Sequence, residues 1–426
     1  MRTLISGGFV ISMDAAVGDL ARGDVLIEDG VIVEVAERID APDAEVINTH
    51  DKVVLPGFVD NHRHTWQTAF RGVGADWTFA DYATVIHGLL KPHYRPEDVY
   101  ISNLFGRVEA LHSGVTTMLD WCHAAPTPEH ADAAIAGLRD APGRSVFCYG
   151  AGYRTDDPID TEVRRVRAQL PDADGLLTMA LGLRGPDETT MGNVIADLKL
   201  ADELGLRTSV HVDGLDGHRP ITALQEHGLL RDTTTYVHTN GLGDDEIQLI
   251  ADTGGSVSIS PDVELKMGFG QPETGRMLAA GLRPTLSADD VPAVAGDLFS
   301  TMRTTYAAQR GLDGGLTSRD LLAFTTINAA DSCGLPTGSL TPGKAADIIV
   351  LRTDDPTVFP FNNPVGTIVT AAHPGLVDTV LVAGRVVKRD GRLVGVDLPT
   401  LKTRLLESRD HVAHAAGFPV DGTWHR

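Results

Sequence analysis

The sequence predicts an α/β protein in which a (β/α)8 barrel of the TIM type is inserted into a small β-sandwich domain formed by both chain ends. Eight short apolar runs alternate with longer segments of helical period between residues 53 and 330. Both chain ends are instead rich in Val and Ile with turn signals. The length of 426 residues suits a large barrel with an accessory domain. We place the composite β domain, with a C-terminal helix, at residues 1–56 and 340–426, and the barrel at residues 57–339.

The N-terminal part of the β domain is expected to be antiparallel. Short runs rich in Val and Ile cover residues 3–11, 24–27, 31–35 and 53–55. Glu28-Asp29-Gly30 between two of these runs is a typical hairpin turn.

The barrel strands are expected at eight apolar runs. They are Val53–Val59, Thr116–Leu119, Ser145–Tyr149, Leu177–Leu183, Thr208–Val212, Thr234–Val237, Ser256–Ile259 and Pro284–Leu286. Helices are expected between and after them, at residues 96–113, 127–138, 244–250, 297–309 and 318–330. Strands that alternate with helices in this way are typical of a parallel barrel.

The last part of the chain returns to β composition. Residues 348–351 and 377–387 are expected to be strands, and Arg389-Asp390-Gly391 is a second hairpin signal. Residues 398–415 form an amphipathic pattern that predicts a terminal helix. Its histidines, His411 and His414, are expected to be a surface or packing pair outside the barrel.

Composition excludes several classes of partner. The net charge of −22 argues against a nucleic-acid or anionic membrane surface, which requires basic residues. Cys122, Cys148 and Cys333 are too few and too widely spaced for a disulfide framework or a cysteine zinc site. The chain has no 18-residue apolar run and no evident signal peptide, so we expect a cytoplasmic protein.

The first barrel run ends in His62 and His64, and this pair suggests a metal site. Residues two apart on a strand point to the same face, and neutral imidazole is a common metal ligand. Such a pair also arises by chance in a chain with 16 histidines. The pair becomes significant together with His211, His238 and Asp289, which end the fifth, sixth and eighth runs. Active sites of these barrels lie at the C-terminal ends of the strands, so the five residues together predict a metal site.

Several motifs resemble the amidohydrolase superfamily in its metal-dependent deaminase and chlorohydrolase branch. Pro56-Gly57-Phe58-Val59-Asp60-Asn61-His62-Arg63-His64 is similar to the first-strand motif of that branch, and Gly114-Val115-Thr116-Thr117 enters the second strand in the same manner. Gly338-Ser339-Leu340-Thr341-Pro342-Gly343-Lys344-Ala345-Ala346-Asp347 is similar to its return to the β domain. The resemblance covers essentially the whole chain and is specific for the superfamily, but weak for the substrate.

The resemblance implies roles for these residues. His62, His64, His211 and Asp289 would hold one divalent ion, zinc or alternatively iron, and His238 would stabilise the developing oxyanion. Relatives with two metals need a lysine at the end of the fourth strand, where this chain has Leu183-Arg184-Gly185.

The chemistry of these groups agrees with the roles. Three neutral imidazoles and one carboxylate leave such an ion cationic, which lowers the pKa of a bound water to about 7. Asp289 would take the proton of that water and pass it to a leaving group. His238 would donate toward the oxygen that gains charge. The expected result is hydrolysis at an electron-poor carbon.

One position departs from the family pattern. Many deaminases of this branch carry a glutamate three residues after the fifth-strand histidine, and this chain has Gly214 there. Asp213 is the nearest acid and is expected to point to the same side as His211 if the strand continues. We therefore consider Asp213 a candidate catalytic residue, against the alternative of a loop carboxylate without a chemical role.

Other residues are candidates for substrate binding. They are Trp66, Gln67, Trp121, His123 and Arg184, which follow the first, second and fourth strands. Trp66 and Gln67 would line the pocket or pack under a loop. Trp121 would stack on a planar ring, and Arg184 would bind an anionic group.

The sequence thus predicts a hydrolase that cleaves a carbon–nitrogen bond of a small nitrogen heterocycle by deamination or cyclic amide hydrolysis. The alternatives are displacement of another leaving group, as in s-triazine chlorohydrolases, and a non-catalytic scaffold of the same fold. The expected partner is a small-molecule substrate. Homo-oligomers are common in the family, so we expect one here by analogy.

Overall fold

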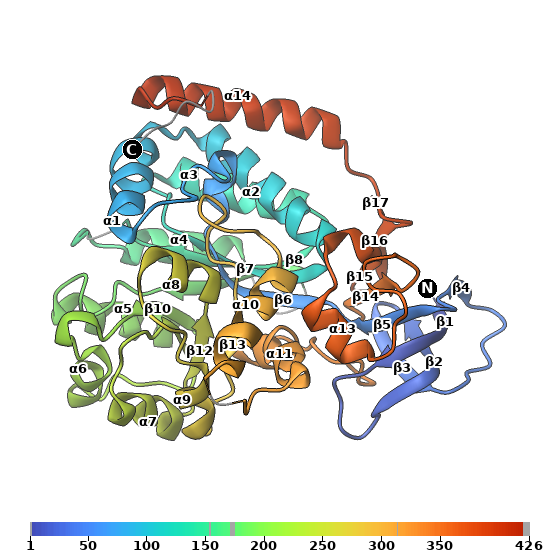
Figure 1. Ribbon diagram of the computed structural model, residues 1–426. Helices are drawn as coiled ribbons and strands as arrows, with labels where there is room; N and C mark the ends of the chain where they lie inside the picture. Colours follow the sequence, from blue (N-terminus) through green and yellow to red (C-terminus); the bar gives the residue numbers. More distant parts are fainter. Residues whose placement is uncertain (1, 153–154, 171–174, 313, 421–426) are drawn as a thin grey trace.

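The fold has two β-sheets, one parallel and one mixed. The computed structural model describes residues 2–152, 155–170, 175–312 and 314–420. Figure 1 shows the mixed sheet, built from the first and last strands of the chain, beside the helix-covered parallel sheet. Among the described helices, none is both long and apolar enough to cross a membrane.

The parallel sheet is the predicted (β/α)8 barrel. Its strands are β6 (Phe58–Arg63), β7 (Val115–Cys122), β8 (Arg144–Gly150), β9 (Leu177–Gly182), β10 (Thr208–Val212), β11 (Thr234–His238), β12 (Ser256–Ile259) and β13 (Thr285–Leu286). They pair in chain order. A parallel bridge between Arg63 and Asp289 joins the segment after β13 to β6. There the Asp289 N–H donates to the His62 carbonyl at 3.1 Å, and the His64 N–H donates to the Asp289 carbonyl at 2.8 Å.

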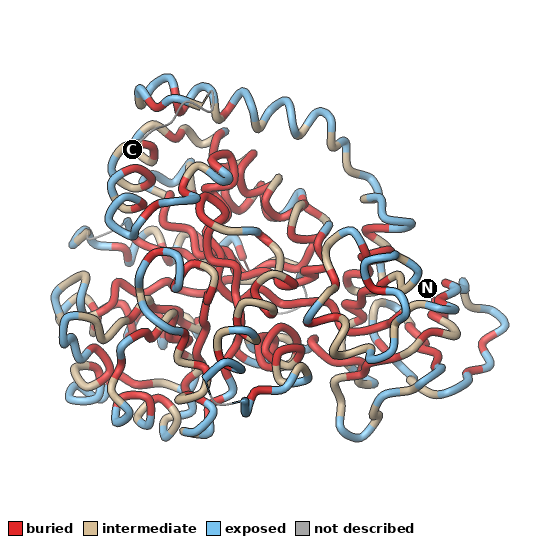
Figure 2. The backbone as a smooth tube through the Cα atoms, in the orientation of Figure 1, coloured by how far each residue is buried: buried red, intermediate tan, exposed pale blue. Residues whose placement is uncertain are grey.

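Helices surround the barrel. They are α2 (Pro96–His112), α3 (Pro128–Asp140), α4 (Asp160–Gln169), α5 (Met191–Leu204), α6 (Pro220–Glu226), α7 (Asp244–Thr253), α8 (Pro261–Met267), α9 (Thr274–Ala279), α10 (Leu298–Arg310), α11 (Ser318–Phe324) and α12 (Ile327–Ser332). Figure 2 shows the buried strands inside and the helices with their outer sides exposed. The helix expected at 318–330 is divided in two, because Thr326 has a ψ of −95° that no helix accommodates.

The first expected strand, Val53–Val59, was wrong as a single element. Residues Lys52–Pro56 form β5 of the mixed sheet, and β6 begins at Phe58. Gly57 lies between them, where a Cβ would come within 2.2 Å of the Thr116 side chain. The chain therefore changes sheets at a position that only glycine fits, and β6 continues far enough to include His62.

The mixed sheet unites the two chain ends, as predicted. Its strands are β1 (Arg2–Ile11), β2 (Asp19–Glu28), β3 (Val31–Ala36), β4 (Glu45–Asn48), β5, β14 (Ile348–Arg352), β15 (Val377–Val382), β16 (Arg385–Arg389) and β17 (Arg392–Leu393). The strand order is β17-β16-β15-β14-β5-β1-β2-β3, with β4 on β1. Ile5, Val25, Val54, Ile348 and Leu381, from both ends, share one buried apolar cluster.

Both predicted hairpin turns are present. Asp29 and Gly30 have φ values of 47° and 87°, and Asp390 and Gly391 have values of 50° and 73°. These positive values match the two-residue turns that join antiparallel strands.

The terminal helix α14 (Leu398–Ala416) lies over α2, on the barrel side of the molecule (Figure 1). After it, the Phe418 ring lies 5.9 Å from the Phe70 ring. The exposed His411 and His414 lie on this helix.

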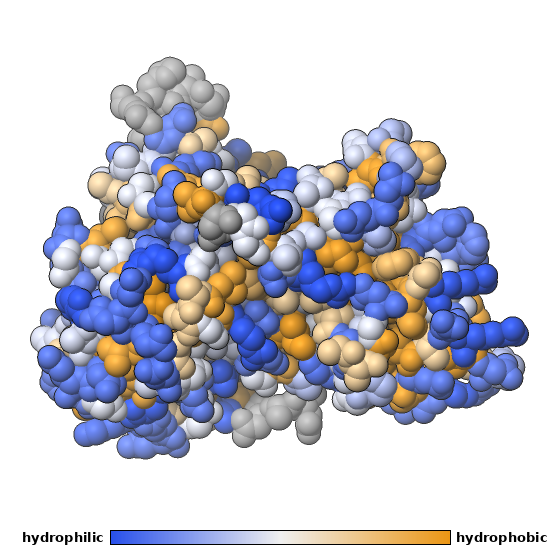
Figure 3. Space-filling model, turned by 60° about the horizontal axis from the view of Figure 1, so that its bottom comes forward, coloured by the Kyte–Doolittle hydropathy of each residue, from blue (hydrophilic) through white to orange (hydrophobic). Residues whose placement is uncertain are grey.

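The division of the chain at residues 56/57 and 339/340 stays a prediction. On the face in Figure 3, hydrophilic side chains cover most of the outer margin.

Candidate active site

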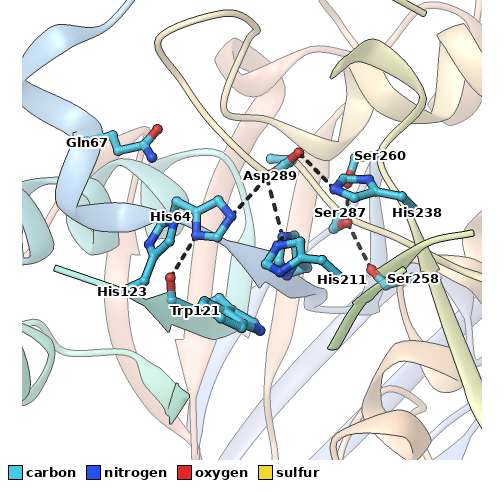
Figure 4. A network of polar contacts seen from close by, with 12 residues as sticks. His64, Gln67, Trp121, His123, His211, His238, Ser258, Ser260, Ser287 and Asp289 are labelled. Atoms are coloured by element: carbon cyan, nitrogen blue, oxygen red, sulfur yellow. Dashed lines mark hydrogen bonds and ion pairs between the residues drawn. The ribbon is translucent and has the colours of Figure 1, made fainter. Parts of the chain in front are cut away.

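Four histidines and one aspartate meet at the C-terminal mouth of the barrel. His62 lies in β6, His64 directly follows β6, His211 lies in β10, His238 ends β11 and Asp289 follows β13. Figure 4 shows the side chains of His64, His211, His238 and Asp289 turned toward one another. His62, His64 and Asp289 are buried, whereas His211 and His238 are partly accessible. The structure thus brings together all five residues that the sequence singled out at strand ends.

The donor atoms have the spacing of ligands around one ion. His62 Nε2 lies 3.2 Å from His211 Nε2 and 3.3 Å from Asp289 Oδ1. His64 Nε2 lies 3.4 Å from the same Asp289 oxygen. Bonds of about 2.0–2.1 Å at tetrahedral angles place neighbouring ligand atoms about 3.3 Å apart. The potential ligand atoms of His62, His64 and Asp289 all lie within 4.8 Å of one another, and so do those of His62, His211 and His238. The two groups share His62 and together make up the candidate metal site.

The histidines have the protonation that metal ligands need. Burial lowers the pKa of His64 to about 3, and it also lowers the pKa of His62 and His211, so these imidazoles are neutral near pH 7. The His64 Nδ1–H donates to the Trp121 carbonyl at 2.7 Å. This hydrogen bond leaves the lone pair of His64 on Nε2, which faces Asp289.

Asp289 is an ionised carboxylate in a strained turn. Burial raises its pKa, but the hydrogen bond to His62 and the nearby charge of His238 lower the pKa below its usual range overall. Asp289 and His238 have positive φ values of 59° and 69°, a region that residues other than glycine rarely adopt. Strain of this kind concentrates at functional sites.

Glu264 is an acid at this site that was not among the residues predicted from the sequence. It lies on α8 and is fully buried, and its Oε1 lies 3.2 Å from His238 Nδ1. The same oxygen accepts the Ser260 N–H at 2.6 Å. Burial lowers the pKa of His238, but the hydrogen bond to Glu264 and the charges of Asp289 and Glu264 raise the pKa above its usual value overall. The available signal was an acid in the first turn of the helix that follows the seventh barrel strand.

Asp213 and Gly214 follow His211 in the chain. Asp213 Oδ1 accepts the Leu215 N–H at 3.0 Å, so this carboxylate supports the local turn. At Gly214 a Cβ would come within 2.3 Å of the Gly241 carbonyl oxygen. The backbone at position 214 is therefore packed too closely for any side chain.

The tryptophans lie beside the histidines but are buried. Trp66 donates from Nε1 to His123 Nδ1 at 3.0 Å, and its ring contacts Tyr94 edge to face. This arrangement matches the alternative of packing under a loop. Trp121 fills the barrel interior, with its ring centroid 4.6 Å from that of His211. Added Cβ atoms at the neighbouring Gly150 and Gly182 would come within 2.3 and 2.7 Å of the Trp121 ring. Trp121 thus packs against the histidines from the barrel interior.

His123 and Gln67 are the predicted substrate residues nearest the histidines. The His123 ring stacks on His64 at 4.4 Å. Gln67 donates from Nε2 to the Tyr82 hydroxyl at 2.6 Å. Its Oε1 is buried and accepts no hydrogen bond from any described residue. Figure 4 shows the Gln67 amide above His64.

Arg184 is held by protein groups. It makes two hydrogen bonds to Asp197, at 2.9 and 2.7 Å, and it donates to the carbonyls of Thr155 and Asp157. These bonds occupy the guanidinium, so we do not include Arg184 among the proposed substrate ligands. Asp290 accepts the Ala293 N–H at 2.9 Å and so stabilises the loop after β13.

Two aromatic residues meet beside His238. Phe79 begins α1 (Phe79–Tyr82), which belongs to the segment after β6, and Phe269 follows α8. Their ring centroids are 5.2 Å apart, and the Phe269 ring lies 5.4 Å from that of His238. Segments that follow the first and seventh barrel strands therefore present aromatic surface next to the site.

Known proteins resemble this chain over nearly its whole length. The model of the amidohydrolase family matches residues 53–387. A 5'-deoxyadenosine deaminase of Methanothermobacter thermautotrophicus is 29% identical over 403 residues, which cover 88% of this chain and 91% of that protein. A 5-methylthioadenosine/S-adenosylhomocysteine deaminase of Symbiobacterium thermophilum is 28% identical over 428 residues, covering 96% and 98%.

Solved structures share the fold. An adenosine deaminase of Xanthomonas campestris with bound zinc has a TM-score of 0.89 at 23% identity, and the match covers 97% of this chain and 98% of that one. The atrazine chlorohydrolase of Arthrobacter aurescens complexed with zinc has a TM-score of 0.87 at 24% identity, covering 96% and 100%. The family match spans most of the chain, including all five residues at the barrel mouth. This chain therefore belongs to the amidohydrolase family.

Proposed function

We propose that this amidohydrolase is a zinc-dependent deaminase that replaces an amino group on a nitrogen heterocycle with an oxygen from water. As a member of the family it is a hydrolase of carbon–nitrogen bonds. The observation that carries the proposal is the convergence of His62, His64, His211 and Asp289, with neighbouring ligand atoms 3.2, 3.3 and 3.4 Å apart, next to His238.

Zinc is the ion that this donor set favours. Three imidazole nitrogens and one carboxylate oxygen are typical ligands of zinc, and iron is the alternative. Arg184, bound to Asp197, stands where relatives with two metals need a lysine, which supports a single ion. When bound, the ion lowers the pKa of water to about 7 and so supplies a nucleophile at neutral pH.

The side chains supply the proton transfers. Asp289, ionised and 3.7 Å from His238 Nε2 through its second oxygen, takes a proton from the attacking water and gives it to the departing amine. His238 donates toward the oxygen that gains charge. Asp213 stays a candidate for a further proton-transfer role, and Asp213→Asn tests it through the turnover number.

The proposed substrates are adenosine derivatives changed at the 5' position. The relatives that cover most of this chain are named as deaminases of 5'-deoxyadenosine and of 5-methylthioadenosine or S-adenosylhomocysteine. The aromatic pair Phe79 and Phe269 offers surface for a planar ring, and Gln67 Oε1 offers an acceptor for a ring N–H or amino group. His123, whose ring stacks on His64 at 4.4 Å, is a further candidate for substrate binding. We further propose that the protein is a cytoplasmic homo-oligomer.

One observation favours a second candidate. Position 214 lacks the glutamate that protonates a ring nitrogen in the related deaminases, and its backbone is too closely packed to accept one. A leaving group that departs without ring protonation, such as chloride on an s-triazine, is therefore the alternative.

The test is ammonia release from a panel of aminated heterocycles that includes 5'-deoxyadenosine, 5'-methylthioadenosine, adenosine, guanine and cytosine. We expect release from the adenosine derivatives, lowered at least about 100-fold in Asp289→Asn, because that variant lacks the proton carrier. No release from any compound, together with chloride release from a chlorotriazine, would replace deamination with the alternative. Equal release by Asp289→Asn would contradict the assigned mechanism.

A further inference from the structure

We propose that Glu264 is a positioning residue that holds His238 by its Nδ1–H and so provides the second proton-transfer path that position 214 cannot provide. This inference rests on the proposed deaminase function and extends it to a residue that has no counterpart in the motifs recognised from the sequence. The juxtaposition of Glu264 with His238 carries the inference.

The contact between the two side chains fixes the orientation of the imidazole. A carboxylate can only accept, so His238 Nδ1 carries the hydrogen in the 3.2 Å contact with Glu264 Oε1. The remaining ring nitrogen, Nε2, then faces Asp289 Oδ2 at 3.7 Å, on the side of the proposed metal ligands. A buried carboxylate that orients a histidine in this way also stabilises the cationic form of the ring during a reaction.

Glu264 is itself rigidly placed. It lies in the first turn of α8, is fully buried, and receives the Ser260 N–H on Oε1. Its second oxygen, Oε2, is buried and has no hydrogen-bond partner among the described residues. A buried carboxylate oxygen without a partner costs free energy, which an apolar residue such as Met would avoid.

Hydrolytic deamination explains why a second path is needed. Water adds its oxygen to the ring carbon while the carbon–nitrogen bond to the amine breaks. One of its two protons goes to the departing amine, which leaves as ammonia, and the other goes to a ring nitrogen. Asp289 can carry only one proton at a time. In the resembling deaminases a glutamate at the position of Gly214 serves the ring nitrogen. We assign that transfer to His238, held by Glu264. The Nε2–H that donates toward the oxygen that gains charge passes its proton to the ring nitrogen, and Nε2 then takes the second proton of the water.

Other charged groups near His238 do not make the same contact. Asp289 faces Nε2 from the segment after β13, and His62 and His211 face the ring from β6 and β10. Asp213 and Asp290 act on His238 only through their charge. Among the described acids, Glu264 is therefore the one that a hydrogen bond joins to Nδ1.

The first experiment measures kcat and KM for the substrate identified by ammonia release, with bound zinc measured in parallel. Glu264→Gln keeps the shape of the side chain and removes its charge. We expect kcat to fall about 100-fold, KM to stay within threefold, and one zinc per chain to remain. Glu264→Asp should recover part of kcat. Asp262→Asn, on the same helix and bonded to the Thr301 hydroxyl, should match the wild type.

A double-variant cycle tests the dependence on His238. We expect Glu264→Gln to lower kcat no further in a His238→Asn background, because the positioning residue then has nothing to hold. A kcat of the double variant that falls by the product of the two single losses would overturn the proposal. A Glu264→Gln variant that keeps kcat within threefold, or that loses its zinc, would also overturn it. A large loss of kcat in Asp213→Asn but not in Glu264→Gln would overturn it as well.

A substrate-free measurement separates this proposal from the proposed function. In proton NMR, an imidazole N–H bonded to a buried carboxylate gives a resonance far downfield. We expect one that disappears in His238→Asn, persists in Asp262→Asn, and moves upfield or vanishes in Glu264→Gln. Its absence from the wild type, or its persistence unchanged in Glu264→Gln, would overturn the Glu264 assignment. Failure of ammonia release with this resonance present would instead refute the deaminase function alone.

Discussion

At the scale of single residues, the site depends on side chains that lie at the ends of barrel strands. It also depends on backbone positions, such as Gly214, that are too closely packed to accept a side chain. His62, His64, His211, His238 and Asp289 could be selected from the sequence because each stands where a barrel strand ends. Glu264 could not be singled out, because its only signal is an acid in the first turn of a helix, and Asp262 stands in the same turn. The actual surroundings of Trp121 and Arg184 also depend on three-dimensional neighbours, Gly150, Gly182 and Asp197, which no local pattern predicts.

Substitution at Gly214 tests the close packing after β10. The φ of Gly214 is −103°, so the obstacle to a side chain is steric and not conformational. We expect Gly214→Ala to lower the free energy of unfolding by about 1–3 kcal/mol, because its Cβ would overlap the Gly241 backbone. Urea unfolding measures the change. Gly192→Ala, at an exposed helical position, is the control and should be neutral or slightly stabilising. A Gly214→Ala protein as stable as the wild type would refute the packing argument.

At the scale of elements, the barrel was predictable because strand and helix periods alternate for eight cycles. The boundary of the first strand was not, because Val53–Val59 reads as one apolar run although Gly57 divides it between two sheets. The short strands β4 and β17 were also missed, since four and two residues carry little pattern. The segments after β6 and after β12, which bring Phe79 and Phe269 together, are decided by long-range contacts.

Phe269 tests the aromatic surface beside His238. Positive φ values at Gly268 and Gly270, 86° and 109°, fix the loop that presents this ring. Stacking on a planar substrate is worth about 0.5–1.5 kcal/mol, so Phe269→Ala should raise KM about two- to twelvefold and change kcat less. Steady-state kinetics provide the measurement. Phe359→Ala, at a ring that is 69% exposed, is the control. An unchanged KM in Phe269→Ala would exclude the ring from substrate binding.

Lys388 on β16 gives the mixed sheet a pH-dependent stability. Its buried ammonium donates to the His112 carbonyl at 2.6 Å, and burial lowers the pKa of Lys388 to about 8 although Asp378 acts in the opposite direction. The unfolded chain, with a lysine pKa of about 10.4, binds more protons between these values, so stability rises with pH in this window.

The matched variant is Lys388→Met. The free energy of unfolding of the wild type should increase relative to Lys388→Met between pH 7.5 and 10.5, by at most about 3 kcal/mol. Denaturant unfolding at several pH values measures this difference. The contributions of the other titrating groups are the same in both proteins and therefore cancel. A difference that is constant or falls with pH would contradict the assignment.

At the scale of the whole molecule, the two sheets are joined by a buried ion pair. Arg144 begins β8 of the barrel and binds Asp347, which precedes β14, at 2.7 and 3.2 Å. Asp347 also accepts the Ala383 N–H at 2.7 Å. The sequence predicted that both chain ends form one unit, but this link joins residues 203 positions apart and was not predictable.

Removal of Arg144 should destabilise the protein strongly. Arg144→Met leaves the Asp347 charge buried without its partner, which costs about 3–5 kcal/mol. Thermal and urea unfolding would show the loss. Arg164→Met, which removes an exposed ion pair with Glu203, should leave stability nearly unchanged. Similar stabilities for the two variants would show that the Arg144–Asp347 pair contributes little.

Hydrogen bonds between the backbones of Asp289 and His62 help to close the barrel, so two proposed metal ligands are also part of the fold. The central claim is that these residues bind a single metal ion. The most direct test strips the protein of metal with a chelator and titrates it with zinc while ammonia release from 5'-deoxyadenosine is followed. The account predicts no release without metal and a linear rise that ends at one zinc per chain. Release by the metal-free protein, or a rise that ends at two zinc ions per chain, would contradict it.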